Sequence, residues 1–348
     1  MRAIKGVDFK GKTVIVRVDY NVPMESGKIV DDLRIRASVP TIEMLREGGA
    51  AKIILISHLG RPEGVTPELS LAPVVKVLDK LVSRVSFIDS VDSEAVREKV
   101  SAMKEGEVLL LENLRFYPGE EENSEEFAQG IIDVTGAEVF VQDGFAVVHR
   151  AHASTDAMAR LLPAYAGLLV EREVEMLSKT ISDPERPLVL IIGGSKVEDK
   201  SPLIEKFLGI ADRILVGGKI AADGFKLDDP KVYVAEDFDT DMEGTKLDIG
   251  PVATAKFAEK LMDAKTVIWN GVLGKVEDPA YATASTIMAE VLGEKEDCLT
   301  VICGGDTTAF VEKTMEEHPR LKYGLISTGG GAALEFLLGK ELPGLKVL

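Results

Sequence analysis

Short apolar runs recur along the chain, and each is followed by a polar or glycine-rich stretch and then by a segment with helical spacing. In the first half, these runs predict strands at residues 13–18, 51–56, 85–88, 107–111 and 138–141. The segments between them predict helices at residues 34–46, 72–81, 93–103 and 124–134. Continuous apolar strands that alternate with helices are typical of parallel sheets with helices on both faces.

The second half repeats this pattern, with predicted strands at residues 188–192, 213–216, 231–234, 266–269, 300–303 and 324–326. The run from Ala164 to Thr180 predicts a helix that connects the halves, so the domain break is expected near residues 162–179. We therefore predict an α/β fold class, with two Rossmann-like, three-layer domains on parallel sheets, joined by a helical hinge.

The composition fits a folded protein and narrows its partners. The chain has 348 residues, of which 45% are hydrophobic and 28% are charged. Its 41 Lys and Arg against 58 Asp and Glu give a net charge of −17, which argues against a binder of nucleic acids or anionic membranes. There are two cysteines, no apolar signal-like run near the start and no apolar run of the ~20 residues that span a membrane. We therefore expect a cytoplasmic location.

In parallel α/β sheets, ligands bind at the carboxyl ends of the strands. In the first half, the residues at or near these ends are largely polar or cationic, and arginines can bind phosphate and carboxylate oxygens with two hydrogen bonds each. A small phosphorylated acid suits this half. The candidate cations are Arg34, Arg61, Arg115 and Arg150. His149 and His152 are spaced i and i+3, but no third metal ligand is fixed by spacing, so we predict no metal site there.

In the second half, the strand ends carry glycine loops instead. The loops are Gly193-Gly194, Gly217-Gly218, Asn270-Gly271, Gly304-Gly305 and Gly329-Gly330-Gly331. Glycine lets backbone N–H groups approach an anion, and a following helix adds its positive N-terminal dipole, so convergent loops suit a polyphosphate. Lys196 and Lys200 lie one helical turn apart and could reach the same phosphates, while Asp306 is a candidate magnesium ligand.

Neither of two common nucleotide-binding motifs is supported by the sequence. Residues 6–13 match G-x-x-x-x-G-K-[ST] to the letter, but no strand-like run precedes them and Thr13 opens a strand rather than a helix, so we do not interpret them as a P-loop. The dinucleotide fingerprint G-x-G-x-x-G is absent, which disfavours a dehydrogenase. The residues alone thus indicate phosphoryl transfer between a nucleotide on the second half and a small acid on the first.

At these positions the sequence resembles the phosphoglycerate kinase family over nearly the whole chain. The matching motifs include RVDYNVP at 17–23, SHLGRP at 57–62, LENLRF at 111–116, HRAHAS at 149–154, GGSKVEDK at 193–200, GGDT at 304–307 and STGGG at 327–331. The resemblance implies the reversible reaction of 1,3-bisphosphoglycerate and ADP to 3-phosphoglycerate and ATP, with magnesium. It also implies a monomer with a glycerate-binding domain over residues 1–165, a nucleotide-binding domain over 166–334, and a C-terminal tail (335–348) that packs back on the first domain.

The resemblance further implies residue roles. Asp19, Tyr20, Asn21, Arg34, His58, Leu59, Gly60, Arg61, Arg115 and Arg150 would hold the glycerate ligand. Arg34, Lys196, Gly305 and Gly330 would face the transferring phosphoryl group. The nucleotide would contact Gly193, Lys196, Lys200, Gly217, Asn270, Glu277, Gly304, Gly305, Asp306 and Thr307, with Glu277 at the ribose hydroxyls and Asp306 at Mg²⁺.

The chain also departs from the family pattern. Between Gly218 and the LDIGP motif at 247–251 it has only about 30 residues, fewer than half the usual number, in a region that helps to wall the adenine pocket. Leu325 replaces a usual histidine. Two alternatives therefore stay open: a family member that binds phosphoglycerate or a partner without efficient nucleotide-dependent catalysis, and a kinase for another small phosphorylated acid.

Overall fold

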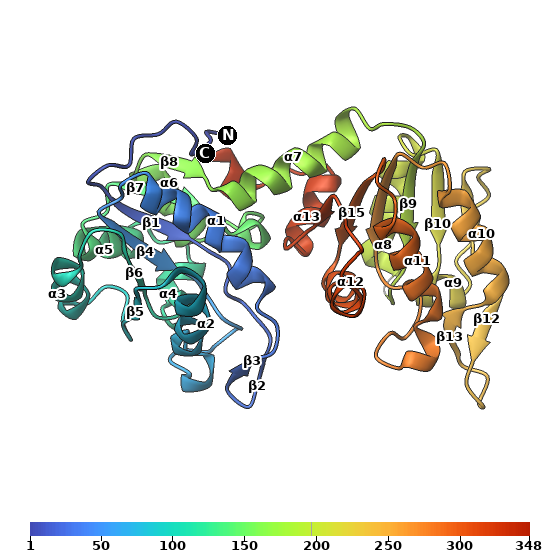
Figure 1. Ribbon diagram of the computed structural model, residues 1–348, viewed down its shortest axis with the longest axis horizontal. Helices are drawn as coiled ribbons and strands as arrows, with labels where there is room; N and C mark the ends of the chain where they lie inside the picture. The colour runs from blue at the N-terminus through green and yellow to red at the C-terminus, as the bar shows by residue number, and fades with distance from the viewer. Residues whose placement is uncertain (196) are drawn as a thin grey trace. The chain divides into compact units, whose positions relative to one another are not determined.

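The computed structural model describes the whole chain apart from residue 196. Its internal contacts divide it into two compact units, each drawn with its own sheet in Figure 1. Unit 1 comprises Met1–Arg172 and Glu341–Leu348, and unit 2 comprises Glu173–Lys340. The boundary falls inside helix α7 (Leu168–Ser182), between Arg172 and Glu173 and within residues 162–179.

Unit 1 is built on a parallel six-stranded sheet with the order β5-β6-β4-β1-β7-β8. The strands are β1 (Thr13–Arg17), β4 (Lys52–Ile56), β5 (Val85–Phe87), β6 (Glu107–Leu110), β7 (Val139–Gln142) and β8 (Ala164–Ala166). The predicted strands of this half are thus confirmed, with small shifts at their ends. A two-stranded hairpin, β2 (Met24–Glu25) with β3 (Lys28–Ile29), follows β1.

Helices cover both faces of this sheet because its central strands are apolar on both sides. Val14 and Val16 of β1 share a buried cluster with Ile35 and Leu78, which lie on α1 (Leu33–Glu47) and α2 (Ala72–Val82). On the other face lie α3 (Glu94–Ala102) and α5 (Glu125–Thr135), which contact each other. The remaining short helices are α4 (Pro118–Glu121), α6 (Met158–Leu161) and α14 (Pro343–Lys346).

Unit 2 has a second six-stranded sheet, ordered β11-β10-β9-β14-β15-β16. Its strands are β9 (Leu188–Ile192), β10 (Arg213–Val216), β11 (Val232–Val234), β14 (Thr266–Asn270), β15 (Leu299–Cys303) and β16 (Leu325–Ile326), all predicted from the sequence and all parallel. In chain order this is 3-2-1-4-5-6, the order of dinucleotide-binding Rossmann sheets. Because all six strands run in the same direction, their carboxyl ends lie at one edge of the sheet.

The core of unit 2 lies between its sheet and two long helices. The fully buried Trp269 packs with Phe257 of α10 (Pro251–Leu261) and Met288 of α11 (Thr283–Gly293). The other helices begin at or after the strand ends: α8 (Val197–Leu208), α9 (Gly218–Ala222), α12 (Gly305–Glu317) and α13 (Gly331–Leu337). The part of the chain that the structure describes contains no helix long and apolar enough to cross a membrane.

One local prediction is wrong, and one hairpin was not predicted. The helix expected over 164–180 begins only at Leu168, because Ala164–Ala166 pair with β7 as strand β8. The helix starts where it does because Thr41 Oγ1 and Asp143 Oδ1 accept the N–H groups of Leu168 and Leu169, both at 3.0 Å. The sequence pattern also missed the antiparallel hairpin of β12 (Phe238–Thr240) and β13 (Lys246–Ile249), which occupies the shortened segment.

Candidate active site

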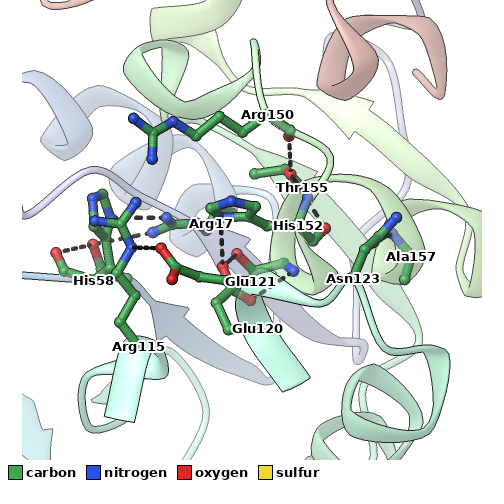
Figure 2. A network of polar contacts seen from close by, with 12 residues as sticks. Arg17, His58, Arg115, Glu120, Glu121, Asn123, Arg150, His152, Thr155 and Ala157 are labelled. Atoms are coloured by element: carbon green, nitrogen blue, oxygen red, sulfur yellow. Dashed lines mark hydrogen bonds and ion pairs between the residues drawn. The ribbon is translucent and has the colours of Figure 1, made fainter. Parts of the chain in front are cut away.

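Arg17 ends strand β1 and lies at the centre of the polar network of unit 1, with 1% of its surface exposed (Figure 2). Its Nη1 donates to Val18 O at 2.7 Å and to Ser57 Oγ at 3.2 Å, and its Nη2 lies 2.9 Å from His58 Nδ1. Burial lowers the pKa of the guanidinium, while the carboxylates of Glu120 and Asp19 raise it. The buried cation is therefore held by its neighbours rather than by water.

His58 follows β4 and is neutral in this setting. A guanidinium group only donates hydrogen bonds, so His58 Nδ1 accepts from Arg17 and the ring proton lies on Nε2. Burial lowers the pKa of His58 well below its ordinary value, and the nearby cations Arg17, Arg115 and Arg34 lower it further. The ring can thus offer a neutral N–H donor at pH 7 without adding charge to a cationic site.

Arg34 is joined to the residues that follow β1. It lies in the first turn of α1, and its Nη1 donates to Asp19 Oδ2 at 2.7 Å and to Asn21 O at 3.1 Å. The Asp19 carboxylate also accepts the N–H of Asn21 at 3.1 Å. Asp19 is almost fully buried whereas Arg34 is 29% exposed, so the carboxylate fixes the direction of a cation that solvent and ligands can reach.

The loop after β4 is held by side chains from two neighbouring strand ends. Gly60 N donates to Asn21 Oδ1 at 2.8 Å, and Gly60 O accepts from Arg115 Nη1 at 2.6 Å. Asn113, after β6, accepts the N–H of Leu59 at 3.2 Å and donates its Nδ2 to Leu59 O at 2.8 Å. The structure therefore brings Asn21, Gly60 and Arg115 together, although they are far apart in the sequence.

The remaining candidates of unit 1 differ in what they offer a ligand. Tyr20 is fully buried, with its hydroxyl 2.9 Å from Ser38 Oγ and its N–H donating to Ser57 Oγ at 2.8 Å, so its polar groups already have partners within the protein. Leu59 is likewise 3% exposed, whereas Arg61 is exposed. Arg150 donates its Nε to His149 Nε2 at 3.3 Å, on the segment that also carries His152 (Figure 2).

In unit 2, the candidate site is a set of backbone loops in direct contact. Gly193 N donates to Asn270 O at 3.0 Å, and Gly194 N donates to Val272 O at 2.7 Å. A Cβ atom on Gly193 would overlap Val272 O, and one on Gly218 would lie 2.8 Å from Gly194 N. The loops after β9, β10 and β14 therefore approach so closely that only glycine fits at these points.

Two cavities open beside these loops. One, of about 290 Å³, is lined by Gly194, Ser195, Gly218, Lys219, Ala222, Phe238, Lys246, Leu247, Asp248, Val272, Leu273, Gly274, Lys275, Glu277 and Asp306. The other, of about 450 Å³, is lined by Lys200, Pro202, Asn270, Gly304, Gly305, Gly330, Gly331, Leu334, Glu335, Leu338 and Lys340. Most predicted nucleotide residues thus line one of these two cavities, whereas Gly193, Gly217 and Thr307 are buried and line neither.

Several hydrogen bonds hold the residues and loops around the larger of these cavities in place. Lys200 Nζ donates to Asn270 Oδ1, and Thr307 Oγ1 accepts the N–H of Gly271 at 2.8 Å. The loop before α13 is held from α7, because Glu173 Oε1 accepts from Thr328 N at 2.7 Å and from Thr328 Oγ1 at 3.0 Å. Lys196, a predicted site residue, lies outside the described residues.

The sequence interpretation missed residues at both sites. In unit 1 these are Arg17, Glu120 and Glu121; an arginine inside the apolar run TVIVRV was the available signal for the first. In unit 2 they include Phe238 and Lys246, because the hairpin that carries them was not predicted. No group of three or more His, Cys, Asp and Glu side chains in residues 1–195 or 197–348 is placed to hold a metal ion by itself.

Sequence comparisons match one family over nearly the whole chain. The family model described as phosphoglycerate kinase matches residues 4–232 and 220–340, in two pieces that overlap at the shortened segment. The phosphoglycerate kinase of Dictyoglomus turgidum is 39% identical over 391 aligned positions, which cover 99% of this chain and 97% of the relative. Because this chain has 348 residues, that relative contains segments which this chain lacks.

Solved structures give the same result. Phosphoglycerate kinase from Pyrococcus horikoshii superposes with a TM-score of 0.88 at 29% identity, covering 100% of this chain and 98% of the other. The enzyme from Coxiella burnetii has a TM-score of 0.79 at 33% identity, covering 99% and 98%. The similarity thus includes both units.

Proposed function

Because the chain belongs to the phosphoglycerate kinase family and catalyses reversible phosphoryl transfer between 1,3-bisphosphoglycerate and ADP, we propose how its two units share this reaction. Unit 1 binds the phosphoglycerate and unit 2 binds the nucleotide. The observation that carries this assignment is the contrast between the strand ends: guanidinium groups gather in unit 1, and glycine loops gather in unit 2.

In unit 1, the charges suit a ligand with both a phosphate and a carboxylate. Arg34, Arg61, Arg115 and Arg150 supply the cations, and Asp19, Asn21 and His58 orient them and the ligand. The carboxylate of 3-phosphoglycerate is itself the nucleophile, so the reaction needs no general base. Two anionic ligands repel by about 4 kcal/mol per unit-charge pair at about 4 Å and an effective dielectric constant near 20. The main task of the side chains is therefore to offset this repulsion.

In unit 2, the glycine loops after β15 and β16 form the phosphate cradle, with Gly305 and Gly330 beside the transferring group. Lys196 and Lys200 add positive charge, and Glu277 binds the ribose hydroxyls. Asp306 lies in the first turn of α12 and lines the smaller cavity. A single carboxylate, completed by water and phosphate oxygens, is a donor set that suits Mg²⁺, so Asp306 would hold the ion. When bound, Mg²⁺ neutralises charge on the nucleotide phosphates.

ATP turnover with 3-phosphoglycerate and magnesium, coupled to reduction of the acyl phosphate, tests the assignment. We expect Arg34→Ala and Lys196→Ala each to lower kcat by about 100- to 1,000-fold, as when a preorganised charge stabiliser is removed. Arg36→Ala is the matched control, because Arg36 lies on the same helix, is 55% exposed and pairs with Asp32. Folded protein without turnover on ATP, GTP or pyrophosphate would instead favour a binding-only family member.

We extend the proposal to the protein's setting. The two cysteines are free, which suits a reducing compartment, and we place the protein in the cytoplasm. We propose a monomer that acts on small molecules.

A further inference from the structure

Two segments of unit 1 that are distant in sequence are joined by side-chain hydrogen bonds. The first, residues 117–123, contains the short helix α4 and is called the anchor segment below. The second, residues 149–157, carries His149, Arg150 and His152 and is called the Arg150 segment. Figure 2 shows residues of both segments beside Arg17. Neither the sequence motifs nor the reaction assigns the anchor segment a role.

Glu120 makes the first connection, and both of its carboxylate oxygens take part. Oε1 accepts from Ser154 Oγ at 2.6 Å, and Oε2 accepts from Ser154 N at 3.0 Å. Oε1 also lies 3.8 Å from His152 Nδ1. The carboxylate is fully buried, and its negative charge acts on the buried Arg17 guanidinium. A buried carboxylate that is fully hydrogen-bonded holds its partners strongly, because none of these bonds can be exchanged for water.

Asn123 makes the second connection, at the other end of the Arg150 segment. Its Nδ2 donates to Asp156 Oδ2 at 2.6 Å, and its Oδ1 accepts the N–H of Ala157 at 3.2 Å. Asn123 adopts a left-handed φ of 55°, a conformation that asparagine tolerates better than most residues. The anchor segment therefore holds both Ser154 and residues 156–157 against unit 1.

From Ser154 the restraint passes to Arg150. The next residue, Thr155, donates its Oγ1 to Arg150 O at 2.7 Å, and the same Oγ1 accepts the N–H of His152 at 3.0 Å. Displacing Ser154 would thus move Thr155, and with it the backbone of both Arg150 and His152. The path from Glu120 to Arg150 therefore consists of hydrogen bonds at its two ends and the peptide link between Ser154 and Thr155 in the middle.

We infer that Glu120 is a positioning residue for phosphoglycerate: it does not touch the ligand but fixes the segment that presents Arg150. The inference rests on the proposed function, in which Arg150 binds the glycerate ligand. It assigns the two neighbouring glutamates of α4 different tasks, since Glu121 pairs with Arg115 Nε at 3.3 Å whereas Glu120 faces inward.

Steady-state kinetics of Glu120→Gln tests the inference. The amide keeps the shape but replaces an acceptor oxygen by a donor opposite Ser154, so we expect the KM for 3-phosphoglycerate to rise about tenfold, equivalent to about 1.4 kcal/mol. The KM for ATP should stay within about twofold, because the nucleotide loops belong to unit 2. A merely structural role would not raise one KM and spare the other.

Three further variants make the result decisive. Ser154→Ala removes the hydroxyl and keeps the N–H bond to Glu120, so a smaller rise, about threefold, is expected, and it remains informative if Glu120→Gln does not fold. Glu122→Gln removes the same charge from an exposed neighbour and should leave both KM values unchanged. Arg150→Ala tests the underlying site and should raise the KM for 3-phosphoglycerate more than either.

The outcomes distinguish a failure of the inference about Glu120 from a failure of the proposed glycerate site. If Arg150→Ala raises the KM but folded Glu120→Gln and Ser154→Ala do not, Glu120 is not a positioning residue and the site assignment stands. If Arg150→Ala has no effect, the proposed glycerate site is itself wrong. If Glu120→Gln raises both KM values equally, its effect is on the fold as a whole and the inference fails.

Discussion

In the proposed function, the two units bind an anion at the same place in similar sheets, but by opposite means. Unit 1 brings long cationic side chains to its strand ends and restrains them with buried carboxylates, as Asp19 restrains Arg34. Unit 2 brings backbone loops together, and its closest approaches are between glycines such as Gly193 and Gly271. Side-chain cations bring full charges that must be balanced, whereas backbone N–H groups bring only dipoles and require no counter-charge.

This difference predicts different weaknesses. A site of balanced charges depends on pH and on each carboxylate, and it can be altered in small steps by exchanging one acceptor. A site of touching backbones is insensitive to charge but tolerates no added volume. Three measurements test this contrast, in order of decreasing expected effect.

We expect the largest effect on stability from adding volume where the loops of unit 2 approach each other. In Gly193→Ala, the new methyl group would overlap the backbone oxygens of Gly271 and Val272, neither of which can move without shifting strand β14. We expect unit 2 to lose about 3 kcal/mol or more of its free energy of unfolding. The single tryptophan, Trp269, is buried in unit 2, so urea unfolding followed by its fluorescence reports on this unit.

Gly209→Ala is the control for that measurement. A Cβ atom there would lie 3.6 Å from Lys206 O, an ordinary contact, and its φ is not in the left-handed region. Its stability should stay within about 0.5 kcal/mol of the parent. Equal destabilisation by the two substitutions would show that the close loops are not what limits unit 2.

We expect the next largest effect on stability from the ionisation of a buried carboxyl group in unit 1. Burial raises the pKa of Asp143 to about 8, with hydrogen bonds from Thr41, Leu169 and Val170 opposing the rise. In the unfolded chain the pKa of an Asp is about 4. The contribution of Asp143 to the free energy of unfolding is therefore fully present below that pH and is lost as the pH rises through about 8. Between about pH 6.5 and about pH 8.5, unit 1 should therefore lose about 1–2 kcal/mol. Hydrogen exchange of β1 and β4 amides, corrected for intrinsic rates, measures this loss.

Unit 2 should not follow in that window. Its buried Asp248 has a pKa raised by burial to about 6, so its own loss is largely complete near neutral pH. Asp143→Asn should abolish the loss in unit 1, while Asp89→Asn, at an exposed position, should leave it unchanged. A parallel decline of both units above about pH 7 would contradict the assignment to Asp143.

The smallest effect is expected at an exposed ion pair. Glu121 is 57% exposed and lies 3.3 Å from Arg115 Nε, where it competes with an incoming anion for that arginine. Exposed pairs contribute about 0–1 kcal/mol, so Glu121→Gln should lower the KM for 3-phosphoglycerate by about two- to threefold. Glu98→Gln on α3 removes the same charge at another exposed position and should have no such effect. A higher KM in Glu121→Gln would mean that the pair orients Arg115 rather than competes for it.

The elements that the sequence predicts well are those whose pattern is local. Leu188–Ile192 is a continuous apolar run and Arg213–Val216 is apolar after its first residue, and both strands form where expected. Strand β8 is missed because Ala164–Ala166 is short, contains small residues and gains its identity by pairing with β7. The hairpin of β12 and β13 is missed because its strands have only three and four residues, so any alternation in them is too short to indicate a strand before the two pair with each other.

The residues of the candidate site likewise differ in whether the local sequence is enough to locate them. Strand ends follow from the strands, so the amino-acid pattern alone is enough to locate Asp19, His58 and the glycine loops. Glu120 cannot be located in this way, because its importance depends on Ser154, 34 residues away in the sequence, and on the burial of both. Tyr20 is the opposite case: the motif includes it, and its side chain packs in the core.

The chain leaves unit 1 after Arg172 and returns to it at Glu341, and this return affects the order in which unit 1 can fold during synthesis. Residues 341–348 belong to unit 1, and Gly344 N donates to Val148 O at 2.9 Å, directly before His149 and Arg150. A ribosome delivers all of unit 2 before these residues, although domains generally fold from the N-terminus as they emerge. The backing of the Arg150 segment is therefore synthesised only after unit 2, and until then the proposed glycerate site of a nascent chain is incomplete.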